Sequence, residues 1–178
     1  MPTVSLAPHP AMPCPGMAGI DVHVSVQPDG GLSLTYTLAG SIAGLRIPAP
    51  AQPCRADGLW QHTCFEAFIM AEHKSDYREF NFSPSGQWAA YAFRTYRDGA
   101  PMELAQAPAI LCQTRERVLH LETSLPRSAL PDGKRIRLGL TAVLEQSDGA
   151  LCYWALRHPP GKPDFHHTDG FALTLELP

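Results

Sequence analysis

The chain has 178 residues, enough for one domain with a sizeable core and with little room for a second. It is 44% hydrophobic and 17% charged, with a net charge of −3, so its composition is globular and lacks the basic excess of a nucleic-acid-binding protein. No apolar run approaches the length of a membrane-spanning helix. The 18 prolines and 14 glycines divide the chain into many short elements, which favours β structure.

The first 19 residues, MPTVSLAPHPAMPCPGMAG, contain five prolines and no continuous apolar stretch. A secretory signal would have a basic start and an apolar centre, so this segment is interpreted as a Pro-rich, weakly ordered lead-in to a domain at 20–178. The five cysteines are an odd number and include no CxxC motif. They indicate reduced structural thiols, and we expect a cytoplasmic location.

From residue 20 onward, runs of alternating or continuously apolar residues are separated by turn sequences such as QPDGG and QSDG. No stretch shows a long 3.6-residue period, so no helix is predicted. The pattern predicts an all-β, single-domain antiparallel sandwich of immunoglobulin-like or jelly-roll-like type, with about ten strands. The predicted strands are 20–26, 32–40, 59–70, 77–84, 87–93, 109–114, 118–125, 136–145, 151–157 and 171–177.

The segment 158–171, HPPGKPDFHHTDGF, gathers histidines, aspartates and prolines before the last predicted strand. Neighbouring residues of an extended chain point to opposite sides, so His166 and His167 are poorly placed to share a zinc ion. One interpretation is a turn fixed by prolines and by backbone bonds to aspartates. We favour a second interpretation, in which the segment is one wall of a ligand pocket, with Phe165 packing on the ligand and Asp164 or His166 bonding to it.

Two consecutive stretches, LWQHTCFEAFI and YREFNFSPSGQWAAYAF, carry a resemblance to known proteins. Trp60 is followed after five residues by Glu66, and FNFSPSG follows in the next strand, with Ser83 where the pattern often has Asn. This order resembles the DOMON-like superfamily, in particular the family 9 carbohydrate-binding modules. The closing sequence KPDFHHTDGFALTLEL is similar to the last loop and strand of that group, and the chain also resembles a bacterial subgroup of stand-alone DOMON-like domains with no settled function.

The resemblance implies a β-sandwich that binds a ligand without catalysis. It matches Trp60 to a sugar-stacking tryptophan, Glu66 to an acceptor for sugar hydroxyls, and Glu79 and Asn81 to a polar pair facing the ligand. The second stacking aromatic is Phe165 here, where the family has Trp. The predicted ligand-binding set is Trp60, Glu66, Glu79, Asn81, Asp164, Phe165, His166 and His167.

Each of these residues also has a purely structural interpretation. Trp60 could pack at an entry to the sandwich, and Glu66 could form a salt bridge with Arg78 or Arg94 on a neighbouring strand. Glu79 and Asn81 share one side of their strand and could lie on an exposed sheet face. The aromatic residues Trp88, Tyr91, Tyr153 and Trp154 are predicted to pack in the core.

The function predicted from these observations is the binding, without catalysis, of a saccharide or a sugar-derived small molecule between Trp60 and the 158–171 loop. No cofactor, nucleic acid or membrane is expected as a partner. One alternative is a haem-binding redox protein, for which His166, His62, Met70 and Met102 are available as axial ligands. A second alternative is an enzyme that uses Glu66 and the histidine-rich loop.

Overall fold

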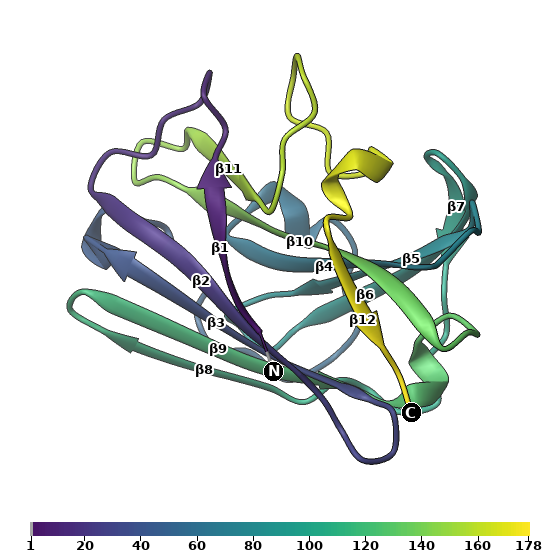
Figure 1. Cartoon of the computed structure of the whole chain (residues 1–178). Helices are drawn as coiled ribbons and strands as arrows, with labels where there is room; N and C mark the ends of the chain where they lie inside the picture. Colours follow the sequence, from purple (N-terminus) through teal and green to yellow (C-terminus); the bar gives the residue numbers. More distant parts are fainter. Residues whose placement is uncertain (1) are drawn as a thin grey trace.

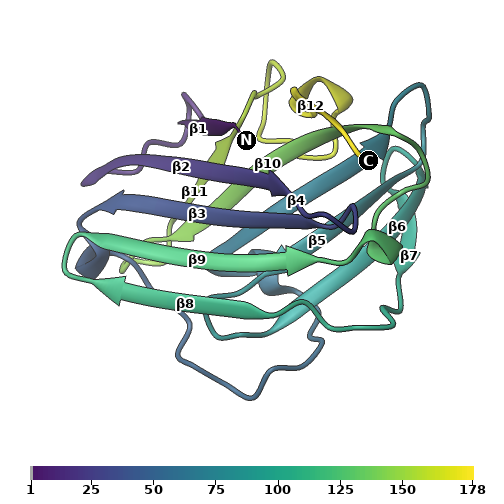
Figure 2. The same ribbon diagram turned by 60° about the horizontal axis from the view of Figure 1, so that its bottom comes forward.

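The chain folds into two antiparallel sheets packed face to face, as described by a computed structural model of residues 2–178 (Figure 1). Met1, the first residue of the expected lead-in, lies outside the described residues. One sheet has the strand order β1–β2–β3–β9–β8, with β1 at Thr3–Pro8, β2 at Met17–Val26, β3 at Leu32–Gly40, β8 at Ile110–Arg115 and β9 at Val118–Leu125. Figure 2 shows β2, β3, β9 and β8 side by side as one layer.

The other sheet has the order β7–β6–β5–β4–β10–β11, and the short strand β12 also pairs with β10. Its strands are β4 at Cys64–Ala71, β5 at Tyr77–Phe82, β6 at Trp88–Thr95, β7 at Asp98–Pro101, β10 at Arg135–Glu145, β11 at Leu151–Ala155 and β12 at Leu173–Glu176. The remaining elements are 3-10 turns at Ile42–Gly44, Leu59–Gln61, Arg127–Ala129 and Thr168–Gly170. None of the helical turns in residues 2–178 is long and apolar enough to cross a membrane.

The all-β antiparallel sandwich predicted from the sequence is confirmed, and the ten predicted strands correspond to β2–β6 and β8–β12. The predicted strand 59–70 begins later, at Cys64, because residues 59–61 form a 3-10 turn after Gly58, whose φ of 73° turns the chain. The short exposed strand β7 was not predicted, because DGAP carries no apolar pattern.

The expected lead-in also differs from the prediction, because residues 3–8 form β1. This strand pairs with β2 at residues 3–6 and with β11 at residues 7–8, so it connects the two sheets. Leu6 is buried in the core. The segment TVSLAP is short and ends at a proline, and its partners include a strand almost 150 positions away, so its own sequence carries little sign of the pairing.

Both faces of β4 are buried, which explains why its sequence CFEAFIMA is almost continuously apolar. Phe65, Ala67 and Ile69 contribute to the main core between the sheets. Phe68 and Met70 point to the opposite face, where they form a smaller cluster with Tyr77 and Phe171. Another segment of the chain therefore packs on the outer face of this sheet.

The cover is the segment between β11 and β12, which includes the loop 158–171 and crosses the outer face of β4 and β10 (Figure 1). Phe171 packs against Gly139 of β10, where a Cβ atom would come within 2.7 Å of the Phe171 ring. The strand β11 pairs with residues 141–145 of β10, and β12 pairs with residues 135–138 of the same strand. The loop therefore connects two strands that lie along the same edge of β10.

Candidate functional site

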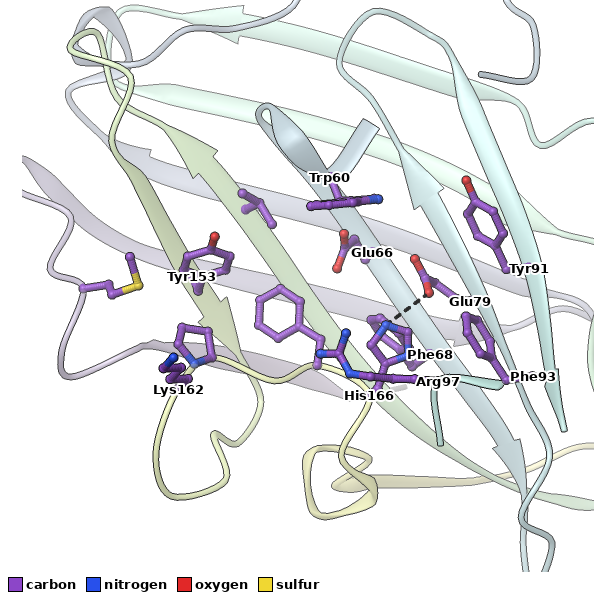
Figure 3. Close-up of a pocket in the computed structure, with 14 residues that line it drawn as sticks. Trp60, Glu66, Phe68, Glu79, Tyr91, Phe93, Arg97, Tyr153, Lys162 and His166 are labelled. Atoms are coloured by element: carbon purple, nitrogen blue, oxygen red, sulfur yellow. Dashed lines mark ion pairs between the residues drawn. The ribbon is translucent and has the colours of Figure 1, made fainter. Parts of the chain in front are cut away.

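A cavity of about 770 Å³ lies on the outer face of the second sheet, between the sheet and the 158–171 loop (Figure 3). Its mouth carries Trp60, whose side chain is 50% exposed although it is large and aromatic. The lining combines aromatic rings with two carboxyl groups and two cationic side chains. The lining residues are Met12, Trp60, Glu66, Phe68, Glu79, Tyr91, Phe93, Arg97, Val143, Tyr153, Lys162, Pro163, Phe165 and His166.

The strand register places the polar groups of the floor in two neighbouring rows. Phe68 of β4 is opposite Glu79 of β5, which is in turn opposite Tyr91 of β6. In the next row, Thr141 of β10 is opposite Glu66 of β4, which is opposite Asn81. Since residues two apart on a strand share a face, Glu66 and Glu79 are diagonal neighbours on the same floor.

Each of the two glutamates is held by a neighbouring side chain of the sheet. Thr141 Oγ1 donates to Glu66 Oε2 at 2.9 Å, and Asn81 Nδ2 donates to Glu79 Oε1 at 2.7 Å. Glu66 is 2% and Glu79 6% exposed, so both carboxyls are largely removed from solvent. The arrangement fixes the two groups while leaving a second oxygen of each for the cavity or for the loop.

Burial raises the pKa of both carboxyls. For Glu66 the loss of hydration is the main cause and the charge of Glu79 adds to it, against the lowering by the Thr141 hydrogen bond. For Glu79 burial outweighs the hydrogen bond from Asn81 and the positive charge of Arg97, both of which lower its pKa. The pair therefore retains a proton at a pH where exposed glutamates have lost theirs.

His166 connects the loop to the floor. Its Nδ1 lies 2.9 Å from Tyr77 Oη, and its Nε2 lies 3.7 Å from Glu79 Oε2. Tyr77 Oη already accepts the backbone N–H of Arg97, so its own proton is available to His166 Nδ1 and the imidazole proton is assigned to Nε2. Burial, followed by the charge of Arg97, lowers the pKa of His166 to about 4, so the ring is neutral at physiological pH.

The tip of the β6–β7 hairpin holds the loop from the other side. Tyr96 Oη donates to Asp164 at 2.7 Å, and the Arg97 guanidinium lies 3.1 Å from the same carboxylate. Asp164 in turn accepts the backbone N–H of His166. Burial opposes ionisation of Asp164, but these donors together keep its pKa below the ordinary value. Asp164 therefore links the β6–β7 hairpin to the backbone of His166.

The 3-10 turn that carries Trp60 is fixed on both sides. Before it, Asp57 pairs with Arg55 and accepts a hydrogen bond from Tyr91 Oη at 2.7 Å. After it, His62 Nδ1 lies 2.7 Å from Glu145 Oε2 at the end of β10. A large exposed aromatic side chain on a turn held at both ends is preorganised for contact with another molecule.

Of the residues predicted from the sequence, five line the cavity: Trp60, Glu66, Glu79, Phe165 and His166. Asn81 does not line it, because it lies behind Glu79 as the hydrogen-bond donor and is fully buried. Asp164 and His167 line a smaller neighbouring hollow that shares Arg97, Lys162 and Pro163 with the main cavity.

Tyr91 and Tyr153 were predicted to be core residues, but both line the cavity and remain partly exposed. Trp88 and Trp154, predicted in the same way, do belong to the core. The strand alternation separates the two pairs, since Trp88 and Trp154 point inward at even positions and the tyrosines point outward at odd ones. Because side chains alternate along β6, Tyr91 must point outward once Trp88 is known to point inward. This alternation is the sign in the sequence that could have placed Tyr91 at the cavity.

The structural alternatives for Glu66 are not observed. Arg78 donates to backbone carbonyl groups at Ser128 and Leu130, and Arg94 pairs with Asp98. Both arginines are therefore engaged elsewhere, and Glu66 bonds to Thr141 instead.

The four residues considered as haem ligands lie in different environments. His166 lines the cavity, Met70 packs in the outer cluster, Met102 packs against the main core, and the ring of His62 is paired with Glu145. Within residues 2–178, no group of three or more His, Cys, Asp or Glu side chains is arranged to hold a metal ion. The five cysteines are free thiols.

The fold is similar to that of two solved structures, a candidate carbohydrate-binding protein and a carbohydrate-binding module. A protein from Bacteroides uniformis, described as a candidate carbohydrate-binding protein, superposes with a TM-score of 0.74 at 15% identity, covering 99% of this chain and 86% of its own. A family 9 carbohydrate-binding module from Caldicellulosiruptor kristjanssonii, solved with cellotriose, has a TM-score of 0.50 at 10% identity, covering 80% and 67%. No protein-family model matches the chain, and no curated protein matches it. At sequence identities of 15% and 10%, these comparisons show a similar fold and nothing further.

Proposed function

We propose that this protein is a non-catalytic binding domain of DOMON-like type, whose ligand is a saccharide or a sugar-derived small molecule held between Trp60 and the 158–171 loop. The observation that carries the proposal is the half-exposed Trp60 at the mouth of a cavity whose floor presents Glu66 and Glu79. An aromatic face suits the C–H face of a pyranose, and fixed carboxyl groups suit its hydroxyls. The likeness in fold to a module that was solved with cellotriose supports the same ligand class.

The proposal is tested by calorimetric titration of the purified protein with a panel of monosaccharides and short β-glucans. We expect saturable binding that weakens about tenfold or more in Trp60→Ala, because the variant loses the stacking face. Leu111→Ala is the matched control, since Leu111 is 54% exposed but lies on β8 of the other sheet, and we expect it to bind as the wild type does. The proposal fails if no sugar binds, or if Trp60→Ala binds as tightly as the wild type.

The pair of buried carboxyls also favours a second candidate function, acid–base hydrolysis of a glycosidic bond. A protonated acid beside a second carboxyl is the arrangement that glycosidases use, and burial raises the pKa of both Glu66 and Glu79. Incubation with nitrophenyl glycosides separates the two candidates. Turnover that disappears in Glu66→Gln would support the enzyme, whereas a binding domain releases no nitrophenol.

A further inference from the structure

The two carboxyl groups on the cavity floor have no cationic partner among residues 2–178. No lysine or arginine forms an ion pair with Glu66 or Glu79, and the contact of Glu79 with His166 is to a ring whose pKa is about 4. Natural proteins rarely bury acidic side chains without a paired cation, because the loss of hydration is costly. Two such groups side by side on a cavity floor therefore lack a positive charge that a bound ligand can supply.

The surroundings of the pair supply little positive charge. A thiol and four phenols near the pair can be neutral or anionic but never cationic. Burial is the main cause that raises the pKa of each, and Glu66 or Glu79 adds to the rise, together with Asp57 in the case of Tyr91, so these groups are uncharged at neutral pH. They are Cys64, Tyr36, Tyr77, Tyr91 and Tyr153. The remaining contacts are neutral donors from Thr141 and Asn81.

Arg97 is the charged group that acts on the pair, since its charge lowers the pKa of Glu79. However, its guanidinium bonds to Asp164 and to Tyr96, so its charge is already shared with a carboxylate. Lys162 lines the cavity on the loop, beside Pro163, and forms no salt bridge within residues 2–178. Figure 3 shows it beside Tyr153, on the opposite side of the cavity from Tyr91.

A protonated amine has the chemistry that this floor lacks. It donates three N–H bonds, which matches two carboxyl groups that have acceptor capacity left after the bonds from Thr141 and Asn81. It is also attracted to the faces of aromatic rings, and Trp60, Tyr91 and Tyr153 lie around the floor. A neutral hydroxyl can bond to either acid but cannot compensate the charge of the pair.

We propose that the cavity selects amino sugars with a free, protonated amino group, which lies between Glu66 and Glu79 while Trp60 covers the ring. This inference rests on the proposed function, because it names the ligand class of the same site. The cavity, at about 770 Å³, has room for a monosaccharide with additional units or substituents toward the mouth.

The experiment compares three ligands of one stereochemistry, glucosamine, N-acetylglucosamine and glucose, by calorimetric titration at pH 7. We expect glucosamine to bind at least tenfold more tightly than the other two, and to release protons when it binds, because its charge favours ionisation of the acids. Proton release is measured by repeating the titration in buffers of different ionisation enthalpy. The double variant Glu66→Gln/Glu79→Gln keeps the shape of both side chains and their bonds to Thr141 and Asn81, and should lose the preference.

Glu122→Gln is the control for removing a carboxyl group away from the cavity, since Glu122 is exposed on β9 of the other sheet, and the preference of this variant for glucosamine should remain. If glucose binds the wild type as tightly as glucosamine does, the inference is overturned while the proposed function stands. If the double variant keeps the preference, the carboxyls are not its source and the inference is again overturned. If none of the three sugars and no member of the wider panel binds, the proposed function itself is wrong.

Discussion

Glu66 and Glu79 are the residues whose chemistry departs most from that of an ordinary strand. Each is buried, each is fixed by one hydrogen bond, and each lies on the face of the sheet that the loop covers. A folded-state pKa above the unfolded value means that the folded chain holds more protons than the unfolded chain between the two values. The stability contributed by protonation is complete below the unfolded pKa and is lost as pH rises through the folded pKa.

We therefore predict that the free energy of unfolding falls between about pH 6.5 and about pH 8 in the wild type, by up to roughly 1.4 kcal/mol per pH unit for each proton that the folded chain holds and the unfolded chain does not. Glu66→Gln/Glu79→Gln should remove most of this slope, since glutamine does not ionise. His166, with its lowered pKa, acts in the opposite direction at lower pH, so the comparison is confined to this range. Urea titrations across it give the slopes, and parallel curves for wild type and variant would contradict the assignment.

Much of the candidate site could be predicted from the sequence, because the resemblance pointed to Trp60, Glu66 and Glu79, and all three line the cavity. The register of β4 and β5 places the two glutamates side by side. Tyr91 and Tyr153 could not, because aromatic residues on sandwich strands usually pack inward. Their strands β6 and β11 carry no acidic residue beside them that would mark the side facing the cavity. The support from Arg97 is equally hidden, since it depends on a hairpin tip meeting a distant loop.

The 158–171 loop covers the outer face of the second sheet. It connects β11 to β12, which both pair with the same edge of β10. At its end, Phe171 packs directly on Gly139 of β10. Residue 139 has no room for a side chain, because a Cβ atom would lie 2.7 Å from the ring of Phe171, which is itself 1% exposed. The glycine is therefore a requirement of the close packing between strand and loop.

Gly139→Ala should destabilise the fold by about 1–3 kcal/mol, as overpacking of a buried site does, and should weaken ligand binding by moving the loop. Gly19→Ala is the control, because Gly19 is also on a strand but a Cβ atom there would have no neighbour within 4 Å, and its effect should stay within about 0.5 kcal/mol. Chemical denaturation measures both. Equal stabilities for the two variants would mean that Phe171 moves aside without cost.

The strand β1 joins the two sheets into one continuous structure. It pairs with β2 through its first four residues and with β11 through its last two, so its loss would expose an edge on each sheet. It also delivers Leu6 to the core and brings Ala7 to the start of the 158–171 loop, where the Ala7 carbonyl lies 2.9 Å from His158 Nε2. The first strand thus supports both the sandwich and the loop that closes the cavity.

Two neighbouring residues of β1 test this arrangement. Leu6→Ala should lower the free energy of unfolding by about 2–5 kcal/mol, the usual cost of truncating a buried leucine, because the side chain is 5% exposed within the main core. Ser5 points to the other face, where its hydroxyl donates to Asp21 at 2.6 Å in an exposed bond, so Ser5→Ala should change stability by about 0.5 kcal/mol or less. If both variants unfold at the same denaturant concentration, residues 3–8 are not docked and behave as the lead-in that the sequence suggested. If Leu6→Ala unfolds in one transition at a lower concentration, the strand belongs to the cooperative core that positions the site.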